Sequence, residues 1–253
     1  MSKTLDYLKQ ARICVIIPTY NNAGTIIEVL KRIRSYAADV IVVNDGSTDD
    51  TAKKIAEARI DGVRTVHLPH NEGKGAALLK GFREARMLGF MSAITIDADN
   101  QHYPEDLPLF AKAHSENHNA LIIGARTLDS IYMRKGSNFA NRLSNIWFYV
   151  QTGLSLRDTQ SGFRLYPLTL LNDHWIITSR YESELEFLVY AAWKGIKITN
   201  IPIRVHYPPK DERVSSFRPV YDFMRITLLN VVLTALALCY YYPVKLLRRL
   251  CHG

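Results

Sequence analysis

The sequence predicts an α/β fold in which a mostly parallel sheet is flanked by helices. Three short apolar segments rich in β-branched residues, Ile13–Ile17, Val40–Val43 and Ala93–Ile96, run directly into polar or turn residues, as buried strands do. Helical patterns separate them, and strands that alternate with helices pair in parallel with helices on both faces. Ligand sites in such sheets lie beyond the carboxyl ends of the strands, so we expect the polar residues there to carry the chemistry.

The helices and the later strands follow from their apolar spacing. In Thr25–Ser35 the residues Ile26, Leu30 and Ile33 share one helical face. Similar patterns predict helices over Asp49–Ala58, Lys74–Arg86, Ser137–Thr152 and Glu182–Lys194. Strands are predicted over Leu121–Ile123 and Ile196–Val205, which makes the region from Ala120 to about His206 α+β in character.

Length and composition restrict the class of protein. A chain of 253 residues with 47% apolar and 22% charged residues can form one α/β domain with a full core and a short appendage. This composition excludes a disordered or collagen-like chain. The three cysteines form no C-x-x-C pair, so we expect reduced thiols rather than a zinc site or a disulfide framework.

The third strand is followed by the most informative motif. Asp97 and Asp99 lie two residues apart, so in an extended segment their side chains point the same way. Paired carboxylates repel unless a cation lies between them, and oxygen ligands of this kind suit Mg²⁺ or Mn²⁺. Taken alone, so short and common a pattern favours a solvated turn with two capping aspartates, but the preceding strand and the neighbouring turns reverse this in favour of the metal.

Three other strand-to-helix turns carry polar residues. Asp45 can hydrogen-bond a nucleoside base, and Tyr20 can pack on one. In the second turn we also expect Gly46 to form the turn and Ser47 or Thr48 to cap the next helix. In the third turn Lys74 lies among glycines at a helix start, which favours phosphate, although the full phosphate-loop spacing is lacking.

These motifs, taken in order, resemble family 2 glycosyltransferases, and most of all the dolichyl- or polyprenyl-phosphate sugar synthases. The resemblance covers roughly residues 10 to 220 and rests on these segments: Pro18-Thr19-Tyr20-Asn21, Asn44-Asp45-Gly46-Ser47, Asn71-Glu72-Gly73-Lys74-Gly75, Asp97-Ala98-Asp99-Asn100-Gln101-His102 and Gln160-Ser161-Gly162-Phe163-Arg164. It implies a GT-A (Rossmann-like) fold, a nucleoside-diphosphate sugar donor, Mg²⁺ or Mn²⁺, and inversion at the anomeric carbon. Relatives often carry an acidic residue where this chain has Asn22.

The resemblance also implies roles for the donor side and a division of the chain. Asp97, Asp99 and Gln101 would gather around the metal, while Pro18, Tyr20 and Asp45 would hold the nucleoside. We expect a catalytic domain over residues 1–224, with a nucleotide-binding half at 10–119 and an acceptor half at 120–224. A membrane-associated tail is expected at 225–253.

On the acceptor side, Arg126 and Arg134 match in placement the arginines that bind the acceptor phosphate in such synthases. Guanidinium groups grip phosphate with paired donors, so this role fits their chemistry. Gln160 and Ser161 can hydrogen-bond sugar hydroxyls. Asp158 fits either a sugar contact or a structural contact to Arg164, and the sequence does not separate the two.

A general base is needed only for a hydroxyl acceptor, because a phosphate monoester is already anionic near neutral pH. Glu182 and Glu184 are candidate bases, although acids also suit the first turn of a helix for structural reasons. Arg213 and Arg218 roughly match a basic loop that closes over the donor diphosphate in related enzymes. Contact with lipid headgroups is the alternative role for this pair.

The C-terminal segment indicates a membrane surface. Ile226–Tyr242 holds 17 uncharged residues, the lower limit for a spanning helix, and basic residues flank it on both sides. A single-pass span, a helix in the interface and a buried helix are the three alternatives. The formal net charge is +8, and with no nucleic-acid-binding motif we expect an anionic lipid partner rather than nucleic acid.

Three functions remain open from the sequence. The first is transfer of a sugar from a nucleoside-diphosphate sugar to a lipid phosphate, at the cytoplasmic face of the inner (plasma) membrane because the polar N-terminal segment is no signal peptide. The second is transfer to a hydroxyl of another lipid or glycan, and the third is a non-catalytic nucleotide-sugar binding module. For catalysis we expect Asp99, Arg126, Arg134, Gln160 and Glu184 to be required.

Overall fold

The computed structural model of the chain describes residues 3–126, 135–170, 176–207 and 219–252. Side chains at 135–139, 219, 220, 249 and 252 are not described either. Along the described chain the regular elements follow in this order: α1 Lys3–Gln10, β1 Ile13–Thr19, α2 Ile26–Arg34, β2 Val40–Asn44, α3 Thr51–Ala58, β3 Val63–His67, α4 Lys74–Met87, β4 Ser92–Thr95, a 3₁₀ turn Pro104–Asp106, α5 Leu107–Glu116, β5 Leu121–Arg126, α6 Lys135–Thr152, β6 Arg164–Pro167, α7 Ser183–Trp193, β7 Ile198–Ile203, α8 Pro219–Leu236, a π-helical turn Ala237–Tyr241 and α9 Tyr242–His252.

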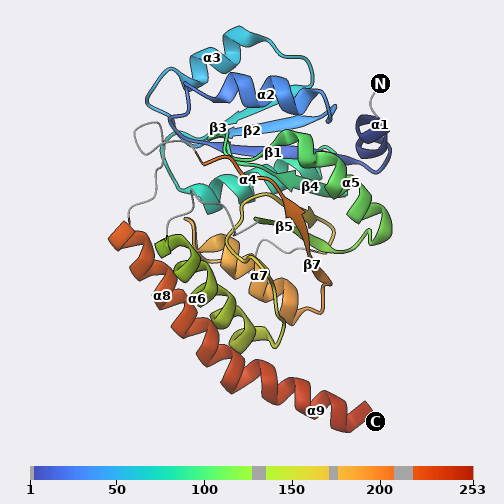
Figure 1. Cartoon of the computed structure of the whole chain (residues 1–253), viewed down its shortest axis with the longest axis vertical. Helices are drawn as coiled ribbons and strands as arrows, with labels where there is room; N and C mark the ends of the chain where they lie inside the picture. Colours follow the sequence, from blue (N-terminus) through green and yellow to red (C-terminus); the bar gives the residue numbers. More distant parts are fainter. Residues whose placement is uncertain (1–2, 127–134, 171–175, 208–218, 253) are drawn as a thin grey trace.

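Seven strands form one twisted sheet in the order β3-β2-β1-β4-β6-β5-β7 (Figure 1). All neighbouring pairs are parallel except the two made by β6, which runs antiparallel to β4 with Ile94 opposite Leu165 and antiparallel to β5. The predicted parallel α/β sheet is therefore confirmed. The strands β3 and β6 and the helices α1 and α5 were not predicted.

Two apolar cores cover the two faces of the sheet. Alternate residues of β1 point to opposite sides, so Val15 belongs to the core that includes residues of α1, α2 and α5, while Ile16 belongs to the core that includes residues of α4, α6, α7 and α8. All seven residues of β1 are buried, as expected for a central strand that is covered on both faces. Because β1, β2 and β4 are parallel neighbours, the turns that follow them meet at one edge of the sheet.

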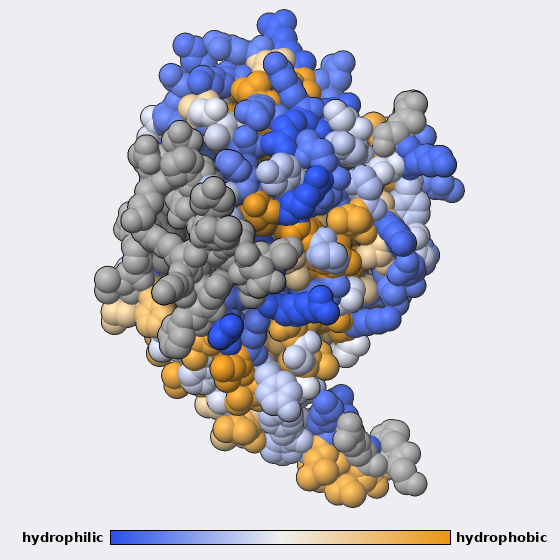
Figure 2. Space-filling view, in the orientation of Figure 1, coloured by the Kyte–Doolittle hydropathy of each residue, from blue (hydrophilic) through white to orange (hydrophobic). Residues whose placement is uncertain are grey.

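The C-terminal helices form an arm on the lower part of the molecule. In Figure 1, α8 lies alongside α6, and α9 continues past the body of the protein. One helix of the described chain, Tyr221–Arg248, is long and apolar enough to cross a membrane. Figure 2 shows apolar residues gathered over this lower part, whereas the end that carries α2 and α3 is mostly hydrophilic.

Candidate active site

The turns after β1 and β2 are locked together by side chains. Asn21 has a positive φ of 55°, and its Oδ1 accepts a hydrogen bond from the Thr48 backbone N–H at 2.8 Å. The Asn21 N–H donates to Ser47 Oγ at 3.0 Å. Ser47 and Thr48 therefore hold the neighbouring turn and do not cap α3, whose N-cap is Asp50, so the capping prediction was wrong. These bonds fix the relative position of the two turns.

The glycine of the second turn behaves as predicted. Gly46 has φ +65°, and a Cβ added there would overlap the backbone of His70, so both conformation and space require glycine. Pro18 is buried at the end of β1, and Tyr20 is partly exposed beside it. The predicted contacts of both residues with a nucleoside stay predictions.

Asp45, at the end of β2, holds the third turn in place. Its Oδ1 accepts the Glu72 N–H at 2.8 Å, and its Oδ2 accepts the Gly73 N–H at 2.9 Å. Burial raises the pKa of Asp45, and the two backbone hydrogen bonds work in the opposite direction. The carboxylate thus ties the β2 turn to the start of α4, and its contact with a base remains a prediction.

Lys74 lies at the centre of the charged cluster. It is the first residue of α4, and its Nζ lies 2.7 Å from Asp97 Oδ1 and 3.0 Å from Glu184 Oε2. Burial opposes the charge on this amine, but the two carboxylates prevail and raise the pKa of Lys74, so it stays protonated. Burial also opposes the charge on the partly exposed Asp97, but the Lys74 ammonium prevails and lowers the pKa of this carboxyl. Three elements distant in sequence therefore meet at one ion-pair network.

Asp99 lies on a loop that is fixed from two sides. Its Oδ1 accepts the Gln101 N–H at 3.0 Å, and the intervening Asn100 has φ +61°. Arg32 of α2 donates to Asn100 Oδ1 at 2.6 Å and pairs with Glu105 at 2.7 Å. Burial, and then the neighbouring charge of Asp97, raise the pKa of Asp99 to about 6. A carboxylate of this kind is one that a divalent cation stabilises.

The residues around these carboxylates fit a hard divalent cation. Gly162 faces the cluster, and a Cβ added there would lie 2.7 Å from both Asp97 Oδ2 and Lys74 Nζ. Its carbonyl accepts the Thr95 hydroxyl at 2.7 Å, which fixes this close approach. Only glycine lets the loop come this close to Asp97 and Lys74. No group of three His, Cys, Asp or Glu residues that could hold a metal is found within the described ranges, and the set of Asp97, Asp99 and Gln101 stays a prediction.

His102, for which the sequence predicts no role, lies beside the carboxylates. Its Nε2 lies 4.0 Å from Asp97 Oδ2, and its ring packs 5.4 Å from that of Phe163. Burial lowers the pKa of His102 to about 4, so the imidazole is neutral at neutral pH. The residue before it is also held, because the Gln101 carbonyl accepts a hydrogen bond from the His206 N–H at 2.8 Å.

Arg126, at the end of β5, pairs with Asp158. Its Nε donates to Oδ2 at 2.7 Å and its Nη2 to Oδ1 at 3.1 Å. Asp158 is fully buried and also accepts the backbone N–H groups of Gln160 and Ser161. From the sequence, Asp158 could contact either the sugar or Arg164. In the structure its side-chain partner is Arg126. Gln160 itself is exposed next to this pair.

Arg164 is fully buried and binds three backbone carbonyls, which the sequence did not predict. Its guanidinium donates to the carbonyls of Ser161 at 2.6 Å, Thr159 at 2.8 Å and Glu184 at 2.7 Å. These bonds join the polar loop before β6 to the first turn of α7. An arginine inside a four-residue strand carries no sequence pattern that distinguishes it from a surface residue.

The two candidate bases have different surroundings. Glu184 pairs with Lys74, whereas Glu182 accepts Arg225 Nε at 2.8 Å and so connects α7 to α8. Glu182 thus has a structural contact, but through an ion pair with α8 rather than through a place in the first turn of α7. Three predicted arginines, Arg134, Arg213 and Arg218, lie outside the described residues.

Comparison with known proteins supports the family that the sequence motifs resemble. The family model described as glycosyl transferase family 2 matches residues 14–173. An undecaprenyl-phosphate mannosyltransferase of Micrococcus luteus is 30% identical over 76% of this chain and 82% of its own. A UDP-N-acetylglucosamine–dolichyl-phosphate N-acetylglucosaminyltransferase of Methanococcus voltae is 26% identical over 77% of this chain and 86% of its own.

A solved structure shows the same fold. Glucosyl-3-phosphoglycerate synthase of Mycobacterium tuberculosis, solved with Mn²⁺, uridine diphosphate and phosphoglyceric acid, superposes with a TM-score of 0.68 at 21% identity, covering 95% of this chain and 84% of that one. The chain belongs to glycosyl transferase family 2 and has the GT-A fold. It is a glycosyltransferase, as the ordered motifs predicted.

Proposed function

We propose that the chain transfers a sugar, with inversion, from a nucleoside-diphosphate sugar to a polyprenyl phosphate at the cytoplasmic face of a membrane. The observation that carries this proposal is the convergence of Lys74, Asp97, Asp99 and Glu184, with the Arg126–Asp158 pair near enough for both sets of charges to act on His102. The names of the Micrococcus luteus and Methanococcus voltae relatives support the acceptor class.

On the donor side, Pro18, Tyr20 and Asp45 are assigned to the nucleoside, and Lys74 to the diphosphate. The N–H groups at the start of α4 favour negative charge in the same place. Asp97, Asp99 and Gln101 would hold Mg²⁺ or Mn²⁺, which, when bound, offsets the charge of the departing nucleoside diphosphate.

On the acceptor side, a phosphate oxygen attacks the anomeric carbon as the bond to the diphosphate breaks. The incoming oxygen is already anionic, so no proton needs to be removed and no general base is required. Glu184 is engaged by Lys74 at 3.0 Å, which supports this route over attack by a hydroxyl. A single displacement from the opposite face inverts the anomeric configuration.

Arg126 and Arg134 are assigned to the acceptor phosphate. Asp158 holds Arg126 by two of its nitrogens, which orients the guanidinium at the end of β5. Gln160, exposed beside them, is assigned to the sugar or the phosphate. Arg213 and Arg218 are assigned to a loop that covers the diphosphate and limits hydrolysis of the donor.

The arm of α8 and α9 is assigned to the membrane, where the acceptor lies. The outer side of α8 exposes large apolar residues, including Met224, Leu228 and Val231. The inner side is buried against the body through Leu229 and Leu233. A helix with one side buried in its own protein and the other side apolar fits a peripheral position in the interface better than an isolated span.

A radiolabelled transfer assay tests the proposal. Purified protein in detergent is given a panel of nucleotide sugars, undecaprenyl or dolichyl phosphate, and Mn²⁺ or a chelator. We expect a lipid product that mild acid hydrolyses, as a glycosyl phosphate is, and loss of transfer with the chelator. An acid-stable product would instead indicate a hydroxyl acceptor. Nucleotide-sugar binding without transfer or hydrolysis would indicate a non-catalytic binding module.

A further inference from the structure

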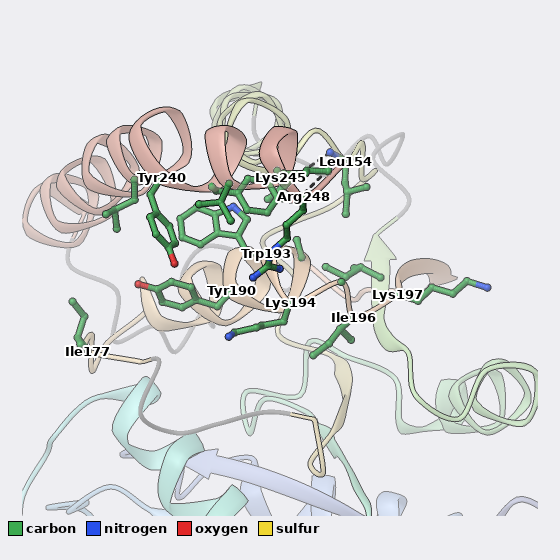
Figure 3. Close-up of a pocket in the computed structure, with 17 residues that line it drawn as sticks. Leu154, Ile177, Tyr190, Trp193, Lys194, Ile196, Lys197, Tyr240, Lys245 and Arg248 are labelled. Atoms are coloured by element: carbon green, nitrogen blue, oxygen red, sulfur yellow. Dashed lines mark hydrogen bonds between the residues drawn. The ribbon is translucent and has the colours of Figure 1, made fainter. Parts of the chain in front are cut away.

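A groove of about 1300 Å³ lies between the C-terminal end of α7, the start of β7 and the inner side of α9 (Figure 3). We call it the tail groove. Aromatic residues from α7 and from the arm meet across it, and Trp193 stacks on Tyr241 with ring centroids 5.4 Å apart. The residues that line it are Thr152, Leu154, Ile177, Tyr190, Ala192, Trp193, Lys194, Gly195, Ile196, Lys197, Ile198, Leu236, Tyr240, Tyr241, Val244, Lys245 and Arg248.

The charged side chains that line the tail groove, as far as the chain is described, are all cations. Its 17 lining residues include Lys194, Lys197, Lys245 and Arg248 and no acidic residue. Lys245 Nζ donates to Tyr241 Oη at 3.2 Å and lies 5.2 Å from the centre of that ring, so the cation is positioned by the aromatic wall. A wall that is aromatic and apolar with cations on it complements a ligand that is both anionic and apolar.

The tail groove is separate from the active site. Glu184, which pairs with Lys74, and Trp193 lie at opposite ends of α7, about 14 Å apart at the helical rise of 1.5 Å per residue. An acceptor phosphate must reach the donor sugar, so the same phosphate cannot also lie in the tail groove during transfer. The two sites can therefore take different lipids.

The surface next to the tail groove is apolar. Leu246, Leu247 and Leu250 of α9 are exposed, while Lys245 and Arg248 of the same helix line the tail groove. Such a helix, apolar on one side and basic on the other, is typical of helices that lie in the membrane interface. The bilayer would then supply the ligand directly.

We propose that the tail groove binds one anionic phospholipid of the bilayer. Lys194, Lys245 and Arg248 contact its phosphate, and its acyl chains pack on Trp193 and Leu236. The apolar wall favours a lipid over a soluble phosphate, and the cations Lys194, Lys245 and Arg248 favour an anionic lipid over a neutral one. This proposal rests on the membrane association in the proposed function and is independent of the transfer chemistry.

Calorimetry with short-chain lipids below their micelle concentration tests the proposal, because monomeric lipid removes the general attraction of a charged surface. We expect one dihexanoyl-phosphatidylglycerol per chain. Dihexanoyl-phosphatidylcholine and glycerol 3-phosphate should each bind at least about tenfold more weakly, since the first lacks the net charge and the second the apolar part.

Variants locate the site. Lys245→Gln with Arg248→Gln should weaken binding of dihexanoyl-phosphatidylglycerol by about 25-fold, at roughly fivefold per cation. The matched control, Lys31→Gln with Lys53→Gln, removes the same charge from exposed positions on α2 and α3 and should change binding less than about twofold. Lys194→Gln alone should also weaken binding of this lipid, and it replaces the double variant in the test if the double variant misfolds.

Three results would each overturn the proposal: equal binding of the two lipids, equal binding of glycerol 3-phosphate, or equal losses in the tail-groove and control variants. Transfer assays on the same preparations distinguish failure of this proposal from failure of the proposed function. If transfer fails while lipid binding is intact, the substrates given in the proposed function are wrong. If transfer is intact while lipid binding fails, the tail groove is not a phospholipid site.

Discussion

The turns of the donor site and the C-terminal arm are built on opposite principles. The turns after β1, β2 and β4 are held by short polar contacts, such as those of Asn21, Asp45 and Lys74. The arm is held mainly by apolar residues on its inner side and leaves a second apolar side exposed. The donor-site turns satisfy their polar groups within the protein, whereas the arm exposes apolar surface that a membrane would cover.

This difference predicts how each region responds to mutation. A polar network that is already closed fixes the donor carboxylates, so changing one reactive group should affect chemistry without unfolding the protein. The arm separates its two roles by helical face. Changes on its outer side should affect membrane binding, and changes on its inner side should affect stability.

The largest effect is expected for Asp99→Asn. Loss of this carboxylate should lower transfer about 10³-fold or more, since charge stabilisation by a bound metal supplies several kcal/mol. Burial and Asp97 disfavour the Asp99 charge, so the melting temperature should stay the same or rise. Transfer assays with Mn²⁺ and scanning fluorimetry measure both. Exposed Asp61→Asn is the control, and metal-dependent turnover in Asp99→Asn would contradict the assignment.

The next effect is expected on the outer side of α8. Leu228 and Val231 are 67% and 53% exposed, and replacing both with glutamate should reduce liposome binding about 100-fold, because their apolar area no longer enters the bilayer. Flotation with vesicles measures the change. Unaltered flotation would mean that α8 does not lie in the membrane.

Leu233→Ala on the inner side gives the matched comparison. Leu233 is buried against the body, so this change should lower the free energy of unfolding by about 2–5 kcal/mol while flotation of the folded fraction persists. If both sides of α8 gave the same pattern, the division of the helix into a membrane side and a packing side would be wrong.

A smaller effect is expected at the Arg126–Asp158 pair. Arg126→Ala should weaken acceptor use about 10- to 100-fold, at roughly 1.5–3 kcal/mol for a charge-assisted bond, while donor affinity changes little. Asp158→Asn keeps the shape of the side chain and leaves Arg126 in place, so it should weaken acceptor use far less than Arg126→Ala does. Steady-state kinetics with donor and acceptor varied separately, together with donor calorimetry, measure this.

Two outcomes would change the assignment of Arg126. Equal losses of donor affinity would move it to the diphosphate. Equal losses of acceptor use in Arg126→Ala and Asp158→Asn, with lowered melting temperatures, would mean that the pair acts only through the fold. A lack of any loss would favour a hydroxyl acceptor and bring Glu184 forward as the base.

The sequence predicted the central fold because its signals were local. The strands β1, β2, β4 and β5 are buried apolar runs, and the turn residues after them are set by backbone geometry. The antiparallel β6 was missed because its four residues include the charged Arg164, which is satisfied by carbonyls of distant segments. The edge strand β3 was missed because its residues are only partly buried and show no continuous apolar run.

The candidate site shows the same division. The motif after β4 identified Asp97 and Asp99 because both lie in one short segment. The partners could not be predicted, because Lys74 with Glu184 and Arg126 with Asp158 meet only through the topology of the sheet. Residue types and spacing indicate which chemistry is present, whereas the pairing of charges depends on which elements become neighbours.

The smallest expected effect lies far from both regions, where α1 packs on α5. His114 of α5 is buried, and its Nδ1 lies 2.8 Å from the hydroxyl of Tyr7 in α1, with the ring of His118 at 5.0 Å. Burial, and then the neighbouring His118, lower the pKa of His114 to about 4. The folded protein therefore keeps this imidazole neutral at a pH where the unfolded chain, with a pKa near 6.5, binds a proton.

The unfolded state thus gains protons as the pH falls below about 6.5, and the free energy of unfolding falls with it until the pH reaches about 4. Between pH 7.5 and pH 5 the loss from His114 amounts to about 2 kcal/mol, or roughly 4–8 °C in melting temperature for a chain of this size. His114→Gln keeps a group that can bond to Tyr7 and does not titrate. Scanning calorimetry at the two pH values should show a smaller acid shift in this variant, by about that amount. All other titrating groups are common to both proteins and cancel in the difference, so equal acid shifts would show that His114 is not the group whose burial opposes protonation.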